Sequence, residues 1–155
     1  MKVKVITISD RASRGVYADE SGPEIARIIR EAYPDAEISI TVVPDERTRI
    51  LAAFEDSADA GFIITTGGTG IGPRDITPEA TREWCRMELP GIAETLRAES
   101  YRETPQAMLS RGTAGLKGNT IVINFPGSVK AVRLCAKTVL PILGHAGEML
   151  SGGGH

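Results

Sequence analysis

Apolar, strand-like runs alternate along this chain with stretches of helical periodicity. The runs at residues 3–8, 38–43 and 62–65 are rich in β-branched side chains, and each stops near a polar residue, a proline or a glycine. Between them, apolar residues recur at helical spacing over residues 25–32 and 50–58, as on the buried face of an amphipathic helix. Because parallel strands must be joined by long crossover connections, this alternation predicts an α/β fold with a mostly parallel sheet.

The second half of the chain predicts more helix and one hairpin. Residues 77–110 are expected to be helical in two or three pieces, with breaks at Pro90-Gly91 and Thr104-Pro105. Strand-like residues 113–116 and 120–124 flank a Lys-Gly-Asn turn that is typical of a hairpin. One strand should therefore run antiparallel to the others.

Length and composition predict one soluble domain over residues 1–150, followed by a flexible, glycine-rich tail at residues 151–155. A net charge of -2 gives no general reason to expect binding to nucleic acid or to an acidic membrane. The start of the chain does not resemble a signal peptide, and no apolar run approaches the ~20 residues of a membrane span. Cys85 and Cys135 form no metal-binding pattern, so free thiols in a cytoplasmic protein are expected.

A glycine-dense segment, residues 66–75, follows the strand at residues 62–65 and precedes a helix start at Thr77-Pro78. Threonine suits the N-cap of that helix, and proline suits its first position. Glycines at the carboxyl end of a parallel strand leave backbone N–H groups open to a phosphate, but the same residues could simply make a tight turn. Their spacing matches neither the P-loop pattern nor the dinucleotide-binding fingerprint. The segment alone therefore predicts either a phosphate-binding loop or a structural turn.

Asp45 and Asp75 follow the second and third predicted strands, which should bring both to the carboxyl edge of the sheet. Asp45 could instead be the N-cap of the next helix, and Asp75 could be a loop acid paired with Arg74 or with another surface cation. Two carboxylates at one phosphate-binding edge would repel each other, and a divalent cation would relieve that repulsion. Asp45 and Asp75 are therefore the candidate ligands of Mg²⁺.

Two further loops are expected at the same edge. Ser9-Asp10 follows the first strand, and Pro126-Gly127-Ser128 opens the last predicted helix, where free N–H groups, a hydroxyl and the ammonium of Lys130 could hold a phosphate. The serine could instead only cap the helix, and Lys130 could face solvent. Arg11 and Arg14 are further candidate anion clamps, although a single surface arginine is usually solvated. The predicted ligand-binding residues are Ser9, Asp10, Thr66, Gly67, Gly68, Thr69, Gly70, Arg74, Pro126, Gly127, Ser128 and Lys130.

In this chain Thr65-Thr66-Gly67-Gly68-Thr69-Gly70 is followed by Pro73-Arg74-Asp75-Ile76-Thr77-Pro78-Glu79-Ala80-Thr81, and this long motif is highly specific. It resembles the signature of the MogA-type molybdopterin adenylyltransferases, a family that includes the G domain of gephyrin. The resemblance covers nearly the whole chain. Further matching segments, in the expected order, are Ser9-Asp10, Ser21-Gly22-Pro23, Val43-Pro44-Asp45-Glu46, Pro90-Gly91, Met108-Leu109-Ser110-Arg111 and Phe125-Pro126-Gly127-Ser128.

This resemblance implies a three-layer α/β/α fold, commonly assembled as a trimer, with a hexamer as the other possible state. It also implies a reaction in which the terminal phosphate of molybdopterin attacks the α-phosphate of ATP and releases pyrophosphate. The adenylylated product would then go to a molybdenum-insertion protein. In the family, the acids that match Asp45 and Asp75 are functionally important and Mg²⁺ is required, so the resemblance implies that these two residues are the catalytic acids. MoaB-type paralogues share the fold and some lack the activity, so a non-catalytic molybdopterin-binding or scaffold module is the alternative. The Pro73-Arg74-Asp75 continuation favours the catalytic branch.

Overall fold

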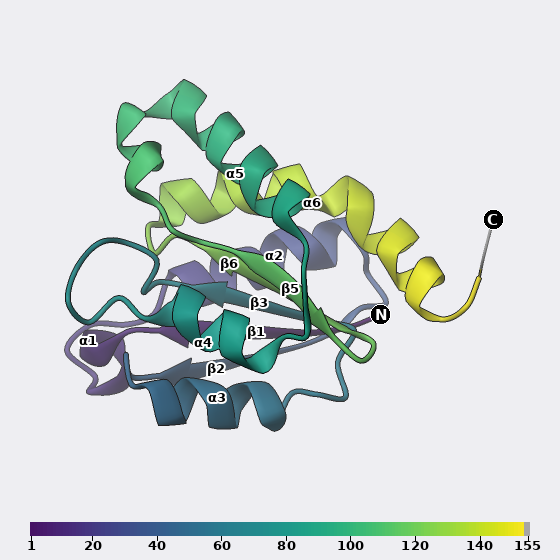
Figure 1. Cartoon of the computed structure of the whole chain (residues 1–155), viewed down its shortest axis with the longest axis horizontal. Helices are drawn as coiled ribbons and strands as arrows, with labels where there is room; N and C mark the ends of the chain where they lie inside the picture. The colour runs from purple at the N-terminus through teal and green to yellow at the C-terminus, as the bar shows by residue number, and fades with distance from the viewer. Residues whose placement is uncertain (154–155) are drawn as a thin grey trace.

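A six-stranded sheet with the strand order β2-β1-β3-β6-β5-β4 forms the centre of the molecule (Figure 1). The structure, a computed structural model, describes residues 1–153; residues 154–155 of the predicted tail lie outside the described residues. β1, β2, β3 and β6 pair in parallel, whereas β5 pairs antiparallel with β6 and β4. The predicted α/β fold with an antiparallel hairpin strand is confirmed. The strands are β1 (Lys2–Ile8), β2 (Glu37–Val43), β3 (Phe62–Thr66), β4 (Met87–Glu88), β5 (Ala114–Lys117) and β6 (Thr120–Phe125).

Helices cover both faces of the sheet, which gives the three layers that the resemblance implies (Figure 1). α2, α5 and α6 pack on one face, and α3 and α4 pack on the other. No helix within residues 1–153 is both long enough and apolar enough to cross a membrane. The helices are α1 (Asp10–Ser13), α2 (Ser21–Ala32), α3 (Arg47–Glu55), α4 (Thr77–Trp84), α5 (Pro90–Glu103) and α6 (Val129–Leu150), with a short 3₁₀ helix η1 (Pro105–Leu109).

The core lies on both sides of the central strands. β3 and β6 are buried over their full length, as expected for parallel strands that helices cover on both faces. On one face of the sheet, Ile29 of α2, Phe125 of β6 and Leu143 of α6 are buried in one apolar cluster. On the other face, the rings of Phe54 and Trp84 join α3 to α4, with their centroids 5.7 Å apart. Burial of this kind of apolar surface is the main force that fixes the sheet between its helices.

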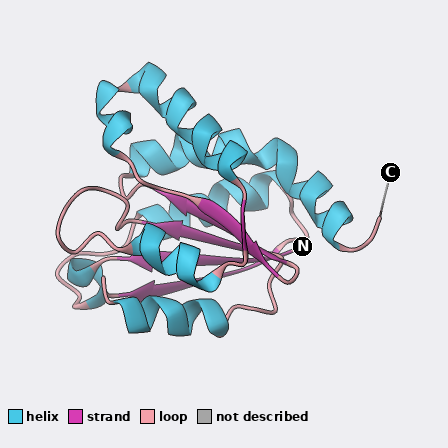
Figure 2. Cartoon of the chain, viewed as in Figure 1, coloured by secondary structure: helices cyan, strands magenta, loops and turns pink. Residues whose placement is uncertain are grey.

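The strand order places a ligand site at one edge of the sheet. β1 lies between β2 and β3, so the chain first adds β2 on one side of β1 and then crosses over to add β3 on the other side. Open α/β sheets bind ligands at the carboxyl ends of strands flanking such a reversal. The register keeps the strand ends level, because Ile8 is paired with Val43, and Thr66 is paired with both Thr7 and Phe125. The loops after β1, β2, β3 and β6 therefore gather on the left in Figures 1 and 2.

Some local predictions are wrong. Thr77 is not the N-cap of α4: the helix begins at Thr77 itself, and Ile76 is the cap. Glu46, rather than Asp45, is the N-cap of α3. Pro90-Gly91 begins α5 instead of interrupting a helix, because proline is well tolerated in the first helical turn. The helical interpretation of residues 77–110 also misses β4, whose two residues are both exposed and show no alternation.

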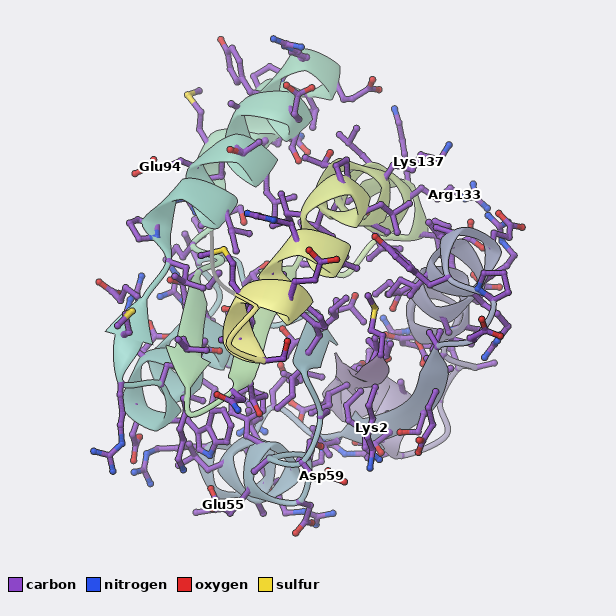
Figure 3. The ribbon with its side chains drawn as sticks, turned by 90° about the vertical axis from the view of Figure 1, so that its right-hand side faces the viewer. Lys2, Glu55, Asp59, Glu94, Arg133 and Lys137 are labelled. Carbon is purple, nitrogen blue, oxygen red and sulfur yellow. The ribbon has the colours of Figure 1, made fainter. Side chains whose placement is uncertain are left out.

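The amino edge of the sheet lies opposite the ligand loops, and Figure 3 views this side. Lys2 and Asp59 point toward each other there and form an ion pair. The Lys2 ammonium also lies 3.9 Å from a carboxylate oxygen of Glu37.

Near the chain end, the backbone N–H of Gly153 donates to the carbonyl oxygen of Glu148 at 3.0 Å. Flexibility of the tail stays a prediction.

Candidate active site

Two cavities lie where the four parallel strands end. The first, of about 440 Å³, is bounded by the glycine loop (residues 66–75), α5 and η1. The second, of about 400 Å³, is bounded by the same loop and by the segment that follows β1. The residues that line both cavities are Gly67, Gly68, Asp75, Gly127 and Ser128. Ligands in the two cavities would therefore meet at the glycine loop, at Asp75 and at the start of α6.

The glycine loop is a fixed turn that only glycine can make at two positions. Gly67 and Gly68 have φ angles of +95° and +67°. A Cβ atom on Gly67 would lie less than 3.0 Å from the carbonyl oxygen of Ile8, and one on Gly68 would lie as close to Oγ1 of Thr77. Thr77, the first residue of α4, ties the loop to this helix, because its hydroxyl donates to the carbonyl oxygen of Gly67 at 3.0 Å. The two interpretations of the loop are compatible, since a fixed turn without side chains also lets a phosphate approach the backbone.

Asp10, Asp45 and Arg74 form one hydrogen-bonded group beside this loop. Asp45 Oδ2 accepts the backbone N–H of Asp10 at 2.8 Å, and Asp10 Oδ1 accepts the backbone N–H of Asp45 at 3.0 Å. Arg74 donates to both carboxylate oxygens of Asp10 at 2.9 Å, so its partner is Asp10 and not Asp75. Asp10 and Arg74 are not among the residues that line either cavity. In this structure they position Asp45, which lines the second cavity.

The fold shifts the pKa values of Asp45 and Asp10 in opposite directions. Burial raises the pKa of Asp45, and the negative charges of Asp10 and Asp75 raise it further. The hydrogen bonds from Arg74 have the opposite effect and lower the pKa of Asp10. Asp45 is therefore the acid whose charge is least favourable in the fold without a ligand, and a cation bound beside it would be stabilised.

Asp45 and Asp75 fit a magnesium site that a substrate completes. Asp75 Oδ2 accepts the backbone N–H of Gly72 at 2.9 Å, and the charge of Asp75 acts on the pKa of Asp45. Within residues 1–153 no group of three His, Cys, Asp or Glu side chains could hold a metal ion. Mg²⁺ characteristically takes one or two protein carboxylates and fills its other positions with substrate phosphates and water. The donor set present here matches that pattern.

The start of α6 forms the wall shared by the two cavities. Ser128 is the N-cap, and its hydroxyl accepts the backbone N–H of Ala131 at 3.2 Å. Thr66 supports this turn, because its hydroxyl donates to the carbonyl oxygen of Pro126 at 2.8 Å. The remaining N–H groups of the first turn, at the positive end of the helix dipole, suit an anion. Lys130 lies apart: its side chain is 80% exposed, its ammonium is 3.5 Å from Glu103, and it does not line either cavity.

Ser9 and Tyr17 lie together in the wall of the second cavity. The side-chain oxygen of Ser9 is 2.9 Å from the phenol oxygen of Tyr17, and it accepts the backbone N–H of Ala12 at 3.1 Å. The guanidinium of Arg11 lies over the Tyr17 ring, 5.3 Å from its centroid. Arg11 and Arg14 do not line either cavity. Tyr17 has no local sequence signal and was not predicted.

Two arginines that the sequence interpretation gave no role also contact the site. The guanidinium of Arg111 donates to the carbonyl oxygens of Gly70 and Asp75 at 2.7 and 2.6 Å. Arg111 also forms an ion pair with Glu79 of α4. It therefore connects the part of the glycine loop between Gly70 and Asp75 to α4. Arg97 of α5 lines the first cavity. The only signal for Arg111 is its place in the segment Met108–Arg111, which matches the family; Arg97 has none.

Comparison with known proteins identifies the family. The family model described as "Probable molybdopterin binding domain" matches residues 4–145. The chain belongs to this family. The molybdopterin adenylyltransferase of Helicobacter pylori strain J99 is 39% identical over 154 residues, which are 97% of the chain and 88% of that protein. The fold and the family that the motifs imply are therefore confirmed.

Other members of the molybdopterin-binding domain family are similar over nearly the whole chain. The molybdenum cofactor synthesis protein cinnamon of Drosophila melanogaster is 40% identical over 149 residues, which are 94% of the chain. The chain spans 25% of the length of that relative. The solved structure of the molybdopterin biosynthesis enzyme MoaB from Thermus thermophilus is 41% identical, with a TM-score of 0.84 over 97% of this chain and 96% of that one. The site described above thus belongs to a molybdopterin-binding fold.

Proposed function

We propose that this chain is a molybdopterin adenylyltransferase, which transfers AMP from ATP to the terminal phosphate of molybdopterin and releases pyrophosphate. One observation carries the proposal. Two cavities, each large enough for a substrate, share a wall made of the glycine loop, Asp75 and the N-terminus of α6. Two phosphorylated substrates seated in them would bring their phosphates together at this wall. The name of the Helicobacter pylori relative supports the same reaction.

The protein's part in this reaction is to position the substrates and to stabilise charge. An oxygen of the molybdopterin phosphate forms a bond to the α-phosphorus of ATP, and the bond from that phosphorus to the β-phosphate bridging oxygen breaks. Backbone N–H groups of the glycine loop and of the first turn of α6 hold the phosphates in line. A phosphate nucleophile is already anionic near neutral pH, so no strong general base is required. Asp45 and Asp75 would hold Mg²⁺, which supplies positive charge to the ATP phosphates when it is bound.

Arg74, Asp10 and Arg111 complete this machinery as supports. Arg74 neutralises Asp10, which fixes the backbone of Asp45, and Arg111 fixes the carbonyl oxygen of Asp75. Asp45 and Asp75, the proposed ligands of Mg²⁺, are thereby held in position by residues that do not line the cavities. A site built in this way keeps its geometry before the substrates arrive, as electrostatic catalysis requires.

The second candidate function is a module that binds molybdopterin without converting it, as in some MoaB-type paralogues. The similarity to the MoaB structure of Thermus thermophilus does not favour this alternative, because the name of that protein also calls it an enzyme. Asp75 lines both cavities and Asp45 lines the second, and this placement favours transfer, because a binder of one ligand needs neither a second cavity nor two carboxylates that could hold a metal ion.

Further proposals complete this function. We propose that the chain acts in the cytoplasm as a homo-oligomer, most simply a trimer, and passes its product to a molybdenum-insertion protein. Resemblance to the MogA-type proteins supports the oligomer and the downstream partner. The free thiols of Cys85 and Cys135 support a reducing compartment.

The test mixes the full chain with molybdopterin, ATP and Mg²⁺ and follows pyrophosphate and adenylylated molybdopterin. Asp75→Asn keeps the size of the side chain and an oxygen for the Gly72 N–H but removes the charge, so turnover should fall by roughly 100-fold or more. The matched control is Asp35→Asn, which removes a charge from an exposed residue away from the site and should leave turnover unchanged. Molybdopterin binding without any product would overturn the enzyme proposal in favour of the binding module.

A further inference from the structure

The two cavities differ in the charge of their walls. The second cavity is lined by four acids, Asp19, Glu20, Asp45 and Asp75, and by no lysine or arginine within the described part of the chain. The first is lined by one acid, Asp75, and by one cationic side chain, that of Arg97. A phosphorylated ligand carries several negative charges, and the overall charge of -2 does not attract it. Among the described residues, Arg97 is thus the single protein cation that lines either cavity.

Arg97 is held where it can reach a ligand beside the glycine loop. It lies on α5, whose C-terminal end is on the same side of the molecule as the loop (Figure 1). Its Nη1 donates to the carbonyl oxygen of Gly112 at 2.6 Å. The residue before Gly112, Arg111, donates its backbone N–H to the carbonyl oxygen of Thr69 at 2.8 Å, so the guanidinium is tied to a segment that contacts the loop. A guanidinium has several further N–H donors in one plane, which can bind phosphate oxygens in pairs.

We propose that Arg97 binds a phosphate group of the substrate that occupies the first cavity. The proposal rests on the adenylyltransferase function and deepens it, since it assigns the anionic end of that substrate to one side chain. Apart from Asp75 at the junction with the second cavity, the rest of the wall offers mainly hydroxyl, amide and apolar groups, including Ser100, Gln106 and Leu96, so the ligand that fits combines a phosphate with a larger uncharged body. Both molybdopterin and ATP have this chemistry, and separate binding measurements distinguish them.

The competing explanation is that Arg97 only ties α5 to Gly112, and three substitutions separate the two roles. Arg97→Gln keeps an N–H donor for the Gly112 carbonyl oxygen but removes the charge. Arg97→Lys keeps the charge, and Arg97→Met removes both. The matched control is Arg102→Gln on the same helix, where the side chain is 76% exposed and paired with Glu99 at 3.2 Å.

The experiment measures dissociation constants by calorimetry for two probes in turn, molybdopterin and α,β-methylene-ATP with Mg²⁺, alongside pyrophosphate release. Arg97→Gln and Arg97→Met should weaken binding of one probe by roughly 10- to 100-fold, while Arg97→Lys keeps most of the affinity and Arg102→Gln keeps all of it. Thermal unfolding of Arg97→Gln should match that of the wild-type protein. Wild-type affinity for both probes in Arg97→Gln, or binding of neither probe by the wild-type protein, would overturn the proposal. Failure of the proposed function looks different: the wild-type protein binds its probes, the effect of Arg97→Gln on affinity persists, and no pyrophosphate appears.

Discussion

Replacement of Gly67 by alanine should destabilise the protein through a clash that no side-chain rotation can remove. Gly67 lies at the end of β3 with a φ angle of +95°, and a Cβ atom there would lie less than 3.0 Å from the carbonyl oxygen of Ile8. That oxygen belongs to the backbone of β1, which is paired on both sides. Either β1 or the glycine loop must therefore move to accept the methyl group.

Two contributions make up the expected loss of stability. A residue with a side chain at positive φ costs about 1–2 kcal/mol. Forcing an extra methyl group into a packed site costs a further ~1–3 kcal/mol. The sum, about 2–5 kcal/mol, is a large part of the ~5–15 kcal/mol by which a domain is usually stable. For a chain of this size it corresponds to a fall in Tm of roughly 4–20 °C.

Gly118→Ala is the matched control. Gly118, in the turn between β5 and β6, also has a positive φ, +58°, but a Cβ atom there would meet nothing within 4 Å. It should therefore show only the conformational contribution, about 1–2 kcal/mol. Urea unfolding followed by circular dichroism gives both values. If Gly67→Ala and Gly118→Ala lose the same free energy of unfolding, the argument from the Ile8 carbonyl oxygen is refuted.

Three further outcomes follow from charge and burial. Because burial and the neighbouring acids raise the pKa of Asp45, Asp45→Asn should be more stable than the wild-type protein at pH 7. The gain should shrink as the pH falls through the raised pKa, and it should vanish below the ordinary pKa range of an aspartic acid, where Asp45 is protonated in both the folded and the unfolded wild-type chain. An equal gain in Tm at pH 3 and pH 7 would contradict the reasoning. Burial raises the pKa of the Cys85 and Cys135 thiols to about 11. The folded protein should therefore react slowly with a thiol reagent at pH 7, and the protein unfolded in denaturant should react rapidly. Equal reaction rates in the folded and unfolded states would contradict this prediction. The sequence predicts that Lys130→Ala weakens binding of a phosphorylated ligand, which calorimetry with α,β-methylene-ATP measures. An unchanged dissociation constant would contradict this prediction and leave Lys130 only its ion pair with Glu103.

The arrangement of the fold could be predicted because its signals are local. The strands β1, β2 and β3 are rich in β-branched residues, and the apolar stripe of α2 has helical spacing. β4 gave no such signal, since two exposed residues pair with β5 only because the chain passes beside that edge. Asp45 does not cap α3, since its carboxylate accepts the backbone N–H of Asp10 instead, and Thr77 is already inside α4.

The site was predictable as far as strand ends determine it. Asp45, the glycine loop and Ser128 each follow a parallel strand, so the direction of the strands brings them to one edge. Arg97 and Arg111 could not be found in this way. Arg111 contacts Gly70, which lies 41 positions earlier in the chain, and Arg97 reaches the cavity from a helix in another layer. Contacts of this kind depend on how the layers pack, and no short pattern in the sequence encodes that.

The balance of charge at the site links metal binding to substrate binding. Asp45 is held in a position that raises its pKa, so the unliganded fold carries an unfavourable carboxylate in the wall of the second cavity. A cation would remove that cost, yet within residues 1–153 no third His, Cys, Asp or Glu is placed to complete a metal site with Asp45 and Asp75. Two carboxylates leave most positions around Mg²⁺ to water or phosphate. A substrate phosphate would therefore strengthen metal binding, and the metal would strengthen binding of that phosphate by the same factor, because coupling between two ligands is reciprocal.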